Sequence, residues 1–166
     1  MVLLAALLVA TYVALTVWKT TSDSSIAHKT EIIFASNSVP VEREVTWKEL
    51  RGLDYTTGMI SSTVQSVNRQ PVRILGFMVP LADNLDSFSE FLIVPDAMAC
   101  IHAPPPAPNQ MVYVKASQNI PLAAAAGYPF WFEGELHVEP IRSSYGTVTY
   151  SLRIWRLRSV MVEHGN

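Results

Sequence analysis

Two apolar segments, each interrupted by a central glycine, constrain the fold most strongly. In residues 72–81 and 130–138, apolar side chains occupy both faces of a predicted strand, and Gly76 or Gly134 lies near its middle. Apolar residues on both faces indicate a strand that is covered on both sides. A glycine inside a strand often marks a bend or a bulge. Two strands bent in this way fit a small closed barrel better than a flat sandwich.

Three further segments complete the predicted sheet. Residues 90–95 and 111–114 are short apolar runs, and residues 147–154 alternate apolar with polar side chains, as expected for a half-buried strand. Residues 142–146 predict the hairpin that leads into the last of these strands. We therefore predict a mainly β fold over residues 45–160, a small OB-like β-barrel of about five strands with one short helix.

The short helix is predicted just before the sheet. Thr46 and Glu49 have the spacing of a capping box, which predicts a helix from Trp47 to about Leu53. Trp47 is expected to plug the core. Residues 54–70 are too sparsely patterned to decide between helix and loop. Residues 32–34 form a predicted short extended contact.

The N-terminal residues 1–18 contain no charge. This length is at the lower limit for a membrane-spanning helix, and Trp18 followed by Lys19 is typical of an interfacial anchor. We favour an uncleaved anchor over a cleaved signal peptide, which would begin with basic residues and end in a small-residue cleavage site. Residues 19–44 are predicted to be a polar linker, and residues 161–166 a tail.

A proline-rich strap separates the second and third predicted strands. Pro104, Pro105, Pro106 and Pro108 fix φ and remove backbone donors, so this segment is expected to be stiff and extended. The only cysteine, Cys100, and His102 precede these prolines.

Cys100 and His102 are two residues apart, so in extended chain their side chains lie on one side. Met98 joins them if the extension reaches back that far. Thiolate and imidazole together suit zinc or copper, which makes the pair a predicted metal site. The alternative is structural, because a lone cysteine is often simply buried and two ligands do not fill the four positions of zinc.

Glu135 and His137, two apart on the outward face of residues 130–138, are a weaker metal half-site. A solvated strand face is the better interpretation there. Arg153, Arg156 and Arg158 are expected to form a small solvated basic end.

Composition limits the classes of function. Charged residues make up only 16% of the chain and the net charge is −2, so there is no basic surface to neutralise nucleic-acid phosphates. A single cysteine forms no internal disulfide. The sequence has no phosphate-binding loop, nucleophile elbow or two-histidine zinc motif. Cys100 as a nucleophile with His102 as its base is the weakest hypothesis, because no third orienting group is apparent. We expect no enzymatic activity.

The run from Cys100 to Gln110 (CIHAPPPAPNQ), followed by MVYV, resembles the signature of a bacterial cell-envelope family known only as domain of unknown function 3299. Residues 72–81 and 90–95 are similar to its first two barrel strands, and residues 130–136 and 150–152 to its closing strands. The resemblance covers roughly residues 45–160. Ala103 and Ala107 depart from the bulkier residues or further prolines that are common in the family.

The resemblance implies an exported protein whose relatives often accompany zinc-responsive transporter genes of the ABC class. It places the domain on the periplasmic side of the inner membrane, although the lysines Lys19 and Lys29 favour the opposite orientation. We expect a membrane-tethered accessory protein that handles zinc or copper through Cys100 and His102 beside such a transporter. The alternative is a non-catalytic module that docks on a membrane protein complex through Pro104, Pro105, Pro106, Pro108 and Asn109.

Overall fold

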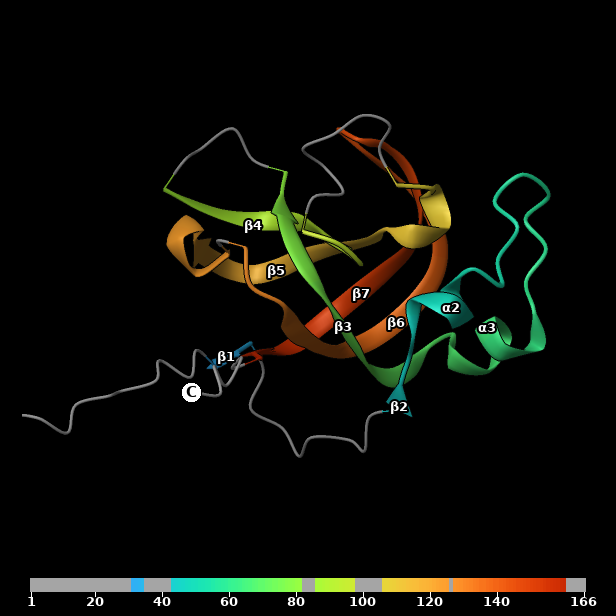
Figure 1. The fold of residues 1–166 in the computed structure, drawn as a ribbon, viewed down its shortest axis with the longest axis horizontal. Helices are drawn as coiled ribbons and strands as arrows, with labels where there is room; N and C mark the ends of the chain where they lie inside the picture. Colours follow the sequence, from blue (N-terminus) through green and yellow to red (C-terminus); the bar gives the residue numbers. More distant parts are fainter. Residues whose placement is uncertain (1–30, 35–42, 82–85, 98–105, 126, 161–166) are drawn as a thin grey trace, which may run out of the picture.

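The structure is a computed structural model, and it describes residues 31–34, 43–81, 86–97, 106–125 and 127–160. The fold is mainly β, as predicted (Figure 1). The strands are β1 (Glu31–Ile33), β2 (Arg43–Glu44), β3 (Gln70–Pro80), β4 (Ser87–Val94), β5 (Val112–Pro121), β6 (Phe130–Ser143) and β7 (Gly146–Ser159). The described residues also contain two α-helices, α2 (Trp47–Leu50) and α3 (Ser62–Val67), and two 3₁₀ turns, η1 (Pro108–Gln110) and η2 (Leu122–Ala125).

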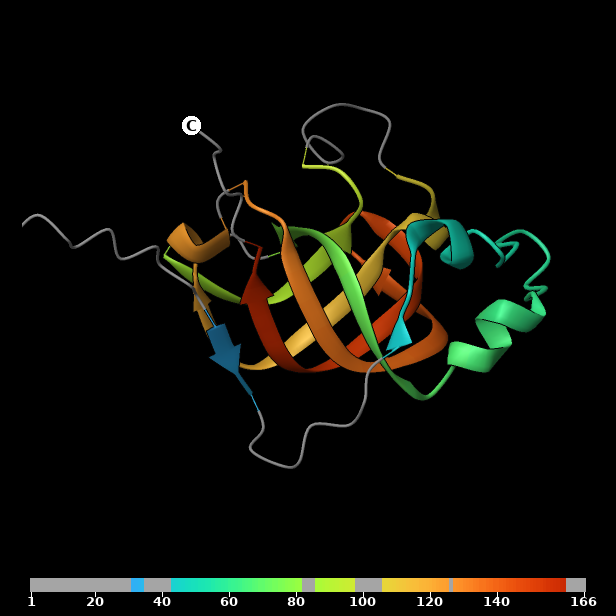
Figure 2. The ribbon, with the colours of Figure 1, turned by 60° about the horizontal axis from the view of Figure 1, so that its bottom comes forward.

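Five strands each pair with two of the others. β3 pairs antiparallel with both β6 and β4, and β4 pairs antiparallel with β5. β5 pairs parallel with β7, and β7 pairs antiparallel with β6, which returns the series to β3. Figure 2 shows these strands crossing one another diagonally around a common interior. β1 extends the sheet beside β7, and β2 lies parallel to β3.

The two strand glycines lie where the sheet changes its pairing. β3 pairs with β6 up to Gly76 and with β4 from Phe77 onward. Gly134 follows a register shift between β6 and β7. A Cβ on Gly76 would lie 2.7 Å from Ile93 Cγ2, and one on Gly134 would lie 2.6 Å from the carbonyl oxygen of Arg153. Both glycines are therefore required by close approach of neighbouring strands, and the register shift at Gly134 confirms the irregularity expected there.

The main core fills the interior of the sheet. Val72 and Ile74 of β3, Phe91 and Ile93 of β4, and Phe132 of β6 are fully buried in it. Alternate residues of β4 point the other way, where a second cluster forms from Leu92, Val94, Met111 and Val148. Burial on both sides explains why β4 is apolar on both faces. β3 was expected to be covered on both sides as well, but its second face is only partly covered, and Leu75 is exposed there.

The predicted capping box at the start of α2 is present. Glu49 N donates to Thr46 Oγ1 and Thr46 N donates to Glu49 Oε2, at 3.3 and 2.8 Å. The helix is shorter than predicted, because it ends at Leu50 and Leu53 instead forms a β-bridge with Ile60. The undecided stretch contains a second helix, α3, which Ser61 caps through its side chain.

The outer face of β6 is not the solvated face that the sequence predicted. Glu133 is fully buried and lies between Arg156 and Arg158, with Arg156 Nη1 3.0 Å from its Oε2. Arg156 Nε is also 3.8 Å from Glu31 of β1. Arg156 and Arg158 of the predicted basic end are thus paired with a buried carboxylate, because β6 and β7 lie side by side at this point.

Residues 1–18 and 161–166, the predicted anchor and tail, lie outside the described residues. Within the part of the chain that is described, no helix has the length and apolar character needed to cross a membrane.

Candidate functional site

The residues of the predicted metal site, Cys100 and His102, lie outside the described part of the chain. Cys100, His102, Pro104 and Pro105 belong to the segment between β4 and η1 that the structure does not describe, as does Met98. The end of the strap, from Pro106 onward, is described. Pro106 and Pro108 are half-buried and Asn109 is buried.

The end of the strap is fixed to α2 through side-chain amides. Asn109 Nδ2 donates to the carbonyl oxygen of Leu53 at 2.8 Å. Gln110 Nε2 donates to the carbonyl oxygen of Trp47 at 3.2 Å, and Arg51 Nη1 donates to Gln110 Oε1 at 3.0 Å. Asn109 thus satisfies the carbonyl group of Leu53, three residues beyond α2, and Gln110 adds a second donor to the Trp47 carbonyl, which also accepts a hydrogen bond from Arg51 N.

The same region is fixed to β7. Thr149 Oγ1 donates to the carbonyl oxygen of Pro108 at 3.1 Å, and Tyr150 Oη donates to that of Leu50 at 2.7 Å. Tyr150 is fully buried, and this burial raises the pKa of its phenol far above the ordinary value. We call this set of contacts between Pro108–Gln110, α2 and β7 the strap brace.

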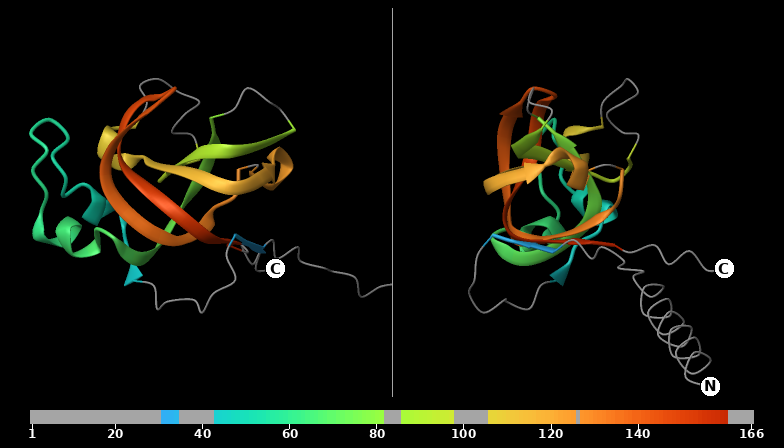
Figure 3. Two further views of the ribbon diagram at one scale, coloured as in Figure 1. Left: turned by 180° about the vertical axis from the view of Figure 1, so that it is seen from behind. Right: turned by 90° about the vertical axis from the view of Figure 1, so that its left-hand side faces the viewer.

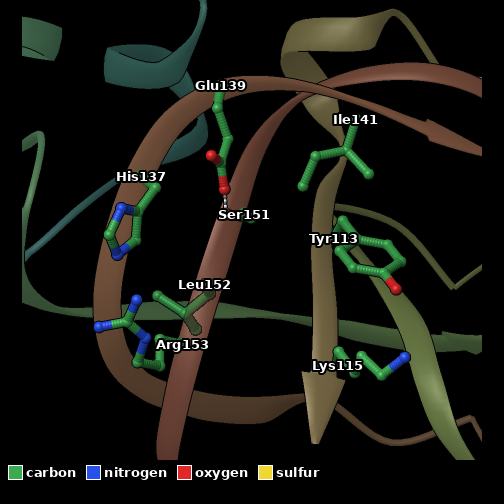
Figure 4. Close-up of a pocket in the computed structure, with 8 residues that line it drawn as sticks. All are labelled: Tyr113, Lys115, His137, Glu139, Ile141, Ser151, Leu152 and Arg153. Atoms are coloured by element: carbon green, nitrogen blue, oxygen red, sulfur yellow. Dashed lines mark hydrogen bonds between the residues drawn. The ribbon is translucent and has the colours of Figure 1, made fainter.

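A polar pocket of about 260 Å³ opens where β5 diverges from β7 (Figure 4). It lies beyond the short parallel pairing that ends at Tyr113 and Ser151. Its lining comes from three strands: Tyr113 and Lys115 of β5, His137, Glu139 and Ile141 of β6, and Ser151, Leu152 and Arg153 of β7.

The charges around the polar pocket compensate one another. Lys115 Nζ lies 2.7 Å from Glu90 Oε1, and this contact lowers the pKa of Glu90 and raises that of Lys115. Burial, together with the nearby Glu90, raises the pKa of Tyr113. Ser151 Oγ donates to Glu139 Oε1 at 2.5 Å. Lys115 and Glu139 thus each have a polar partner, Glu90 and Ser151 respectively.

Glu135 and His137, the weaker half-site predicted on β6, do come together. His137 Nε2 lies 2.8 Å from Glu135 Oε1, and Arg153 Nη1 lies 3.8 Å from the same oxygen. Among the described residues, no group of three or more His, Cys, Asp and Glu side chains could hold a metal ion. Glu135 and His137 are thus in contact with each other, and both side chains are partly buried, at 35% and 19% exposure.

A second hollow, of about 410 Å³, is lined mainly by apolar side chains. It forms where β3 changes partner at Gly76, between the end of β4 and the start of β6. Its lining residues include Trp47, Leu75, Phe77, Pro95, Pro129 and Trp131, and we call it the tryptophan groove. Trp47 Nε1 donates to the carbonyl oxygen of Leu75 at 2.7 Å, which fixes the indole as one wall.

Arg73 stands beside the groove. Its guanidinium carbon lies 4.7 Å from the centre of the Trp131 ring, and its Nη2 lies 3.0 Å from Glu44 Oε2. A cation over an indole face holds the ring in a fixed orientation. Sequence reasoning placed Trp47 in the core, and the ring does pack against it. The sequence did not indicate that the Trp47 side chain forms a groove with Trp131, because Trp47 and Trp131 are distant in the sequence.

Comparison with known proteins agrees with this fold. A family model described as "Protein of unknown function (DUF3299)" matches residues 21–159. The chain belongs to the DUF3299 family. A crystal structure of a DUF3299 family protein from Pseudomonas aeruginosa PAO1 is similar to it, with 24% sequence identity and a TM-score of 0.60 over 74% of this chain and 98% of that chain. This likeness concerns the fold alone. No curated protein matches the sequence.

Proposed function

We propose that this DUF3299 protein is a non-catalytic interaction module of the bacterial envelope, held on the periplasmic side of the inner membrane by residues 1–18. In this proposal, it docks on a membrane protein complex through a face formed by the tryptophan groove and the proline-rich strap. The single observation that carries the proposal is the groove itself, an apolar hollow between two indole rings. Tryptophan-lined hollows are favourable anchoring sites for protein partners.

Trp47 joins the two parts of the proposed docking face. Its ring lines the groove, and its carbonyl group accepts the hydrogen bond from Gln110 at the end of the strap. An extended partner segment in the groove would therefore lie next to the strap. Leu75, which is 40% exposed, offers apolar surface to such a segment.

For the scaffold, we infer an OB-like barrel. The cycle of five pairings, the parallel contact of β5 with β7 and the change of partner along β3 support this inference. OB-like barrels bind many kinds of ligand on their outer surface, so the fold is compatible with docking but does not specify the partner.

The experiment measures the size of the native complex in gently solubilised envelopes of the host. A Leu75→Glu change places a charge in the groove, and we expect the chain to shift from a large complex to a much smaller species. Ile33→Glu is the matched control, because Ile33 is an exposed apolar strand residue outside the groove, 56% exposed on β1. If the chain already migrates alone, or if both variants migrate as the parent does, the docking proposal is wrong.

A second candidate function is metal handling, with zinc or copper bound by Cys100 and His102 beside an ABC-type transporter. The observation that favours it is the strap brace, because it fixes the chain six residues after His102 at Pro108. A stiff proline segment with one end fixed restricts the positions of the residues that precede it. Further ligands would come from Met98 or from a partner.

A further inference from the structure

The loop between α2 and α3 exposes three large apolar side chains, of which Ile60 lies nearest the base, bridged to Leu53. Tyr55 is 51% exposed, Met59 67% and Ile60 39%. Figure 1 shows the loop projecting beyond both helices, at the opposite end of the domain from β1, and the left view of Figure 3 shows the same projection from behind. Exposed apolar residues grouped on a projecting loop indicate a contact with a membrane or with another molecule.

The tip carries no charge. From Tyr55 to Asn68 every residue is uncharged, and the nearest acidic group is Asp54 at the base of the loop. The Asp54 carboxylate faces into the loop, where Oδ1 accepts hydrogen bonds from Thr56 N and Thr57 N at 2.8 and 3.3 Å. These bonds lower its pKa.

The backbone donors of the tip are satisfied within the loop. Besides Thr56 and Thr57, Gly58 N donates to the Asp54 carbonyl at 2.7 Å, and Met59 N donates to Thr57 Oγ1 at 3.3 Å. Asp54 N donates in turn to the Met59 carbonyl at 2.8 Å. Four consecutive N–H groups therefore need no water, which lowers the cost of moving the loop into an apolar medium.

Basic residues flank the tip on both sides. Lys48 and Arg51 lie at α2, and Arg69 follows α3; all three side chains are exposed. In a bilayer, the apolar side chains of the loop would contact the acyl chains. The lysine and arginine side chains would then lie at the level of the anionic headgroups. A tyrosine at the edge of the apolar group suits the same boundary.

The size of the tip distinguishes a bilayer from a protein partner. A stable protein interface involves about 20–30 residues on each side, whereas residues 55–60 form a narrow projection. Insertion into a bilayer needs only a few apolar side chains that enter together. We propose that residues 55–60 insert into the interface of a lipid bilayer and give the domain a second membrane contact besides residues 1–18. This proposal does not depend on the tryptophan groove.

The test locates one residue of the tip in the membrane. The full chain, in a Cys100→Ser background, carries Met59→Cys labelled with an environment-sensitive fluorophore and is reconstituted into vesicles of phosphatidylethanolamine and phosphatidylglycerol. Lipids with a quencher on the acyl chain report insertion. Because residues 1–18 hold every variant near the membrane, the same label at Ser117→Cys, on the exposed face of β5, is the control.

We expect a blue-shifted emission at position 59 and quenching at least twofold stronger than at position 117. Adding Tyr55→Asp should reduce the quenching at position 59 to the level of the control, while the circular dichroism spectrum stays unchanged. Equal quenching at positions 59 and 117 in a folded protein would overturn the proposal. Quenching at position 59 that survives Tyr55→Asp would also overturn it, since the label alone would then account for insertion.

Discussion

Asn109 donates a hydrogen bond of 2.8 Å to the carbonyl oxygen of Leu53, and this bond joins residues 56 positions apart in the sequence. Leu53 lies at the base of the exposed loop, and Asn109 lies at the end of the proline-rich strap. Gln110, the next residue, holds Trp47 of the tryptophan groove. The strap brace therefore sets the position of both surfaces that we propose for binding.

Replacing Asn109 by alanine tests the strap brace. The change leaves the buried Leu53 carbonyl without its donor, which costs about 1–3 kcal/mol of the free energy of unfolding. Part of this loss is offset, because Asn109 Oδ1 is buried without a hydrogen-bond partner among the described residues. Urea unfolding of the full chain measures the change. Asn119→Ala, at an exposed position of β5, is the control and should alter the stability by less than about 0.5 kcal/mol. Equal stability of the two variants would contradict the brace.

The buried phenol of Tyr150 predicts a loss of stability in alkali. Burial raises its pKa in the folded protein above the ordinary value of 10.0. The stabilising effect is therefore fully present below about pH 10 and declines as the pH rises further, because the unfolded chain then loses a proton that the folded chain retains.

Tyr150→Phe isolates this contribution. Near neutral pH the variant should be less stable by about 1–2 kcal/mol, because the hydrogen bond to Leu50 is lost. Above about pH 10 the difference from the parent should shrink by up to about 1.4 kcal/mol per pH unit. Unfolding by urea at a series of pH values measures the difference. A constant difference between about pH 8 and pH 11 would show that Tyr150 titrates normally.

The sequence was sufficient for the parts of the fold that depend on local pattern. Alternating side chains located β7, the capping box located the start of α2, and the central glycine of β6 located its register shift. Each of these signals arises from neighbouring residues, whose spacing reflects strand or helix geometry directly.

The contacts that define the candidate sites join residues far apart in the sequence. Nothing near Glu133 in the sequence indicates that Arg156 and Arg158 cover it, since β6 and β7 pair at this position only in the folded chain. The helix α3 was undecided because Val64 and Val67 alone mark its buried face. The tryptophan groove depends on the change of partner at Gly76, which places Trp47 beside Trp131.

Gly76→Ala tests whether close approach at this change of partner is essential. A Cβ there would lie 2.7 Å from Ile93 Cγ2 and 2.8 Å from the carbonyl oxygen of Val94, so one strand must shift. We expect a loss of more than about 3 kcal/mol or failure to fold. Gly127→Ala is the control, because Gly127 has a φ of +71° and no atoms within 4 Å of the added carbon. It should cost only about 1–2 kcal/mol through backbone strain. Thermal unfolding compares the two, and a similar small loss in both would contradict the close approach.

Metal binding by Cys100 and His102 predicts that the purified, reduced full chain retains one zinc or monovalent copper ion. Cys100→Ser should lose the ion, because a hydroxyl group is a much poorer ligand than a thiolate for these soft and borderline metals. His137→Gln is the matched control, since it removes the other histidine that the sequence singled out and should leave the metal content unchanged. Elemental analysis and titration with a competing chelator measure content and affinity. If the parent chain binds neither metal tightly, the pair is not a metal site in the isolated protein, and the strap then has only the bracing and docking roles.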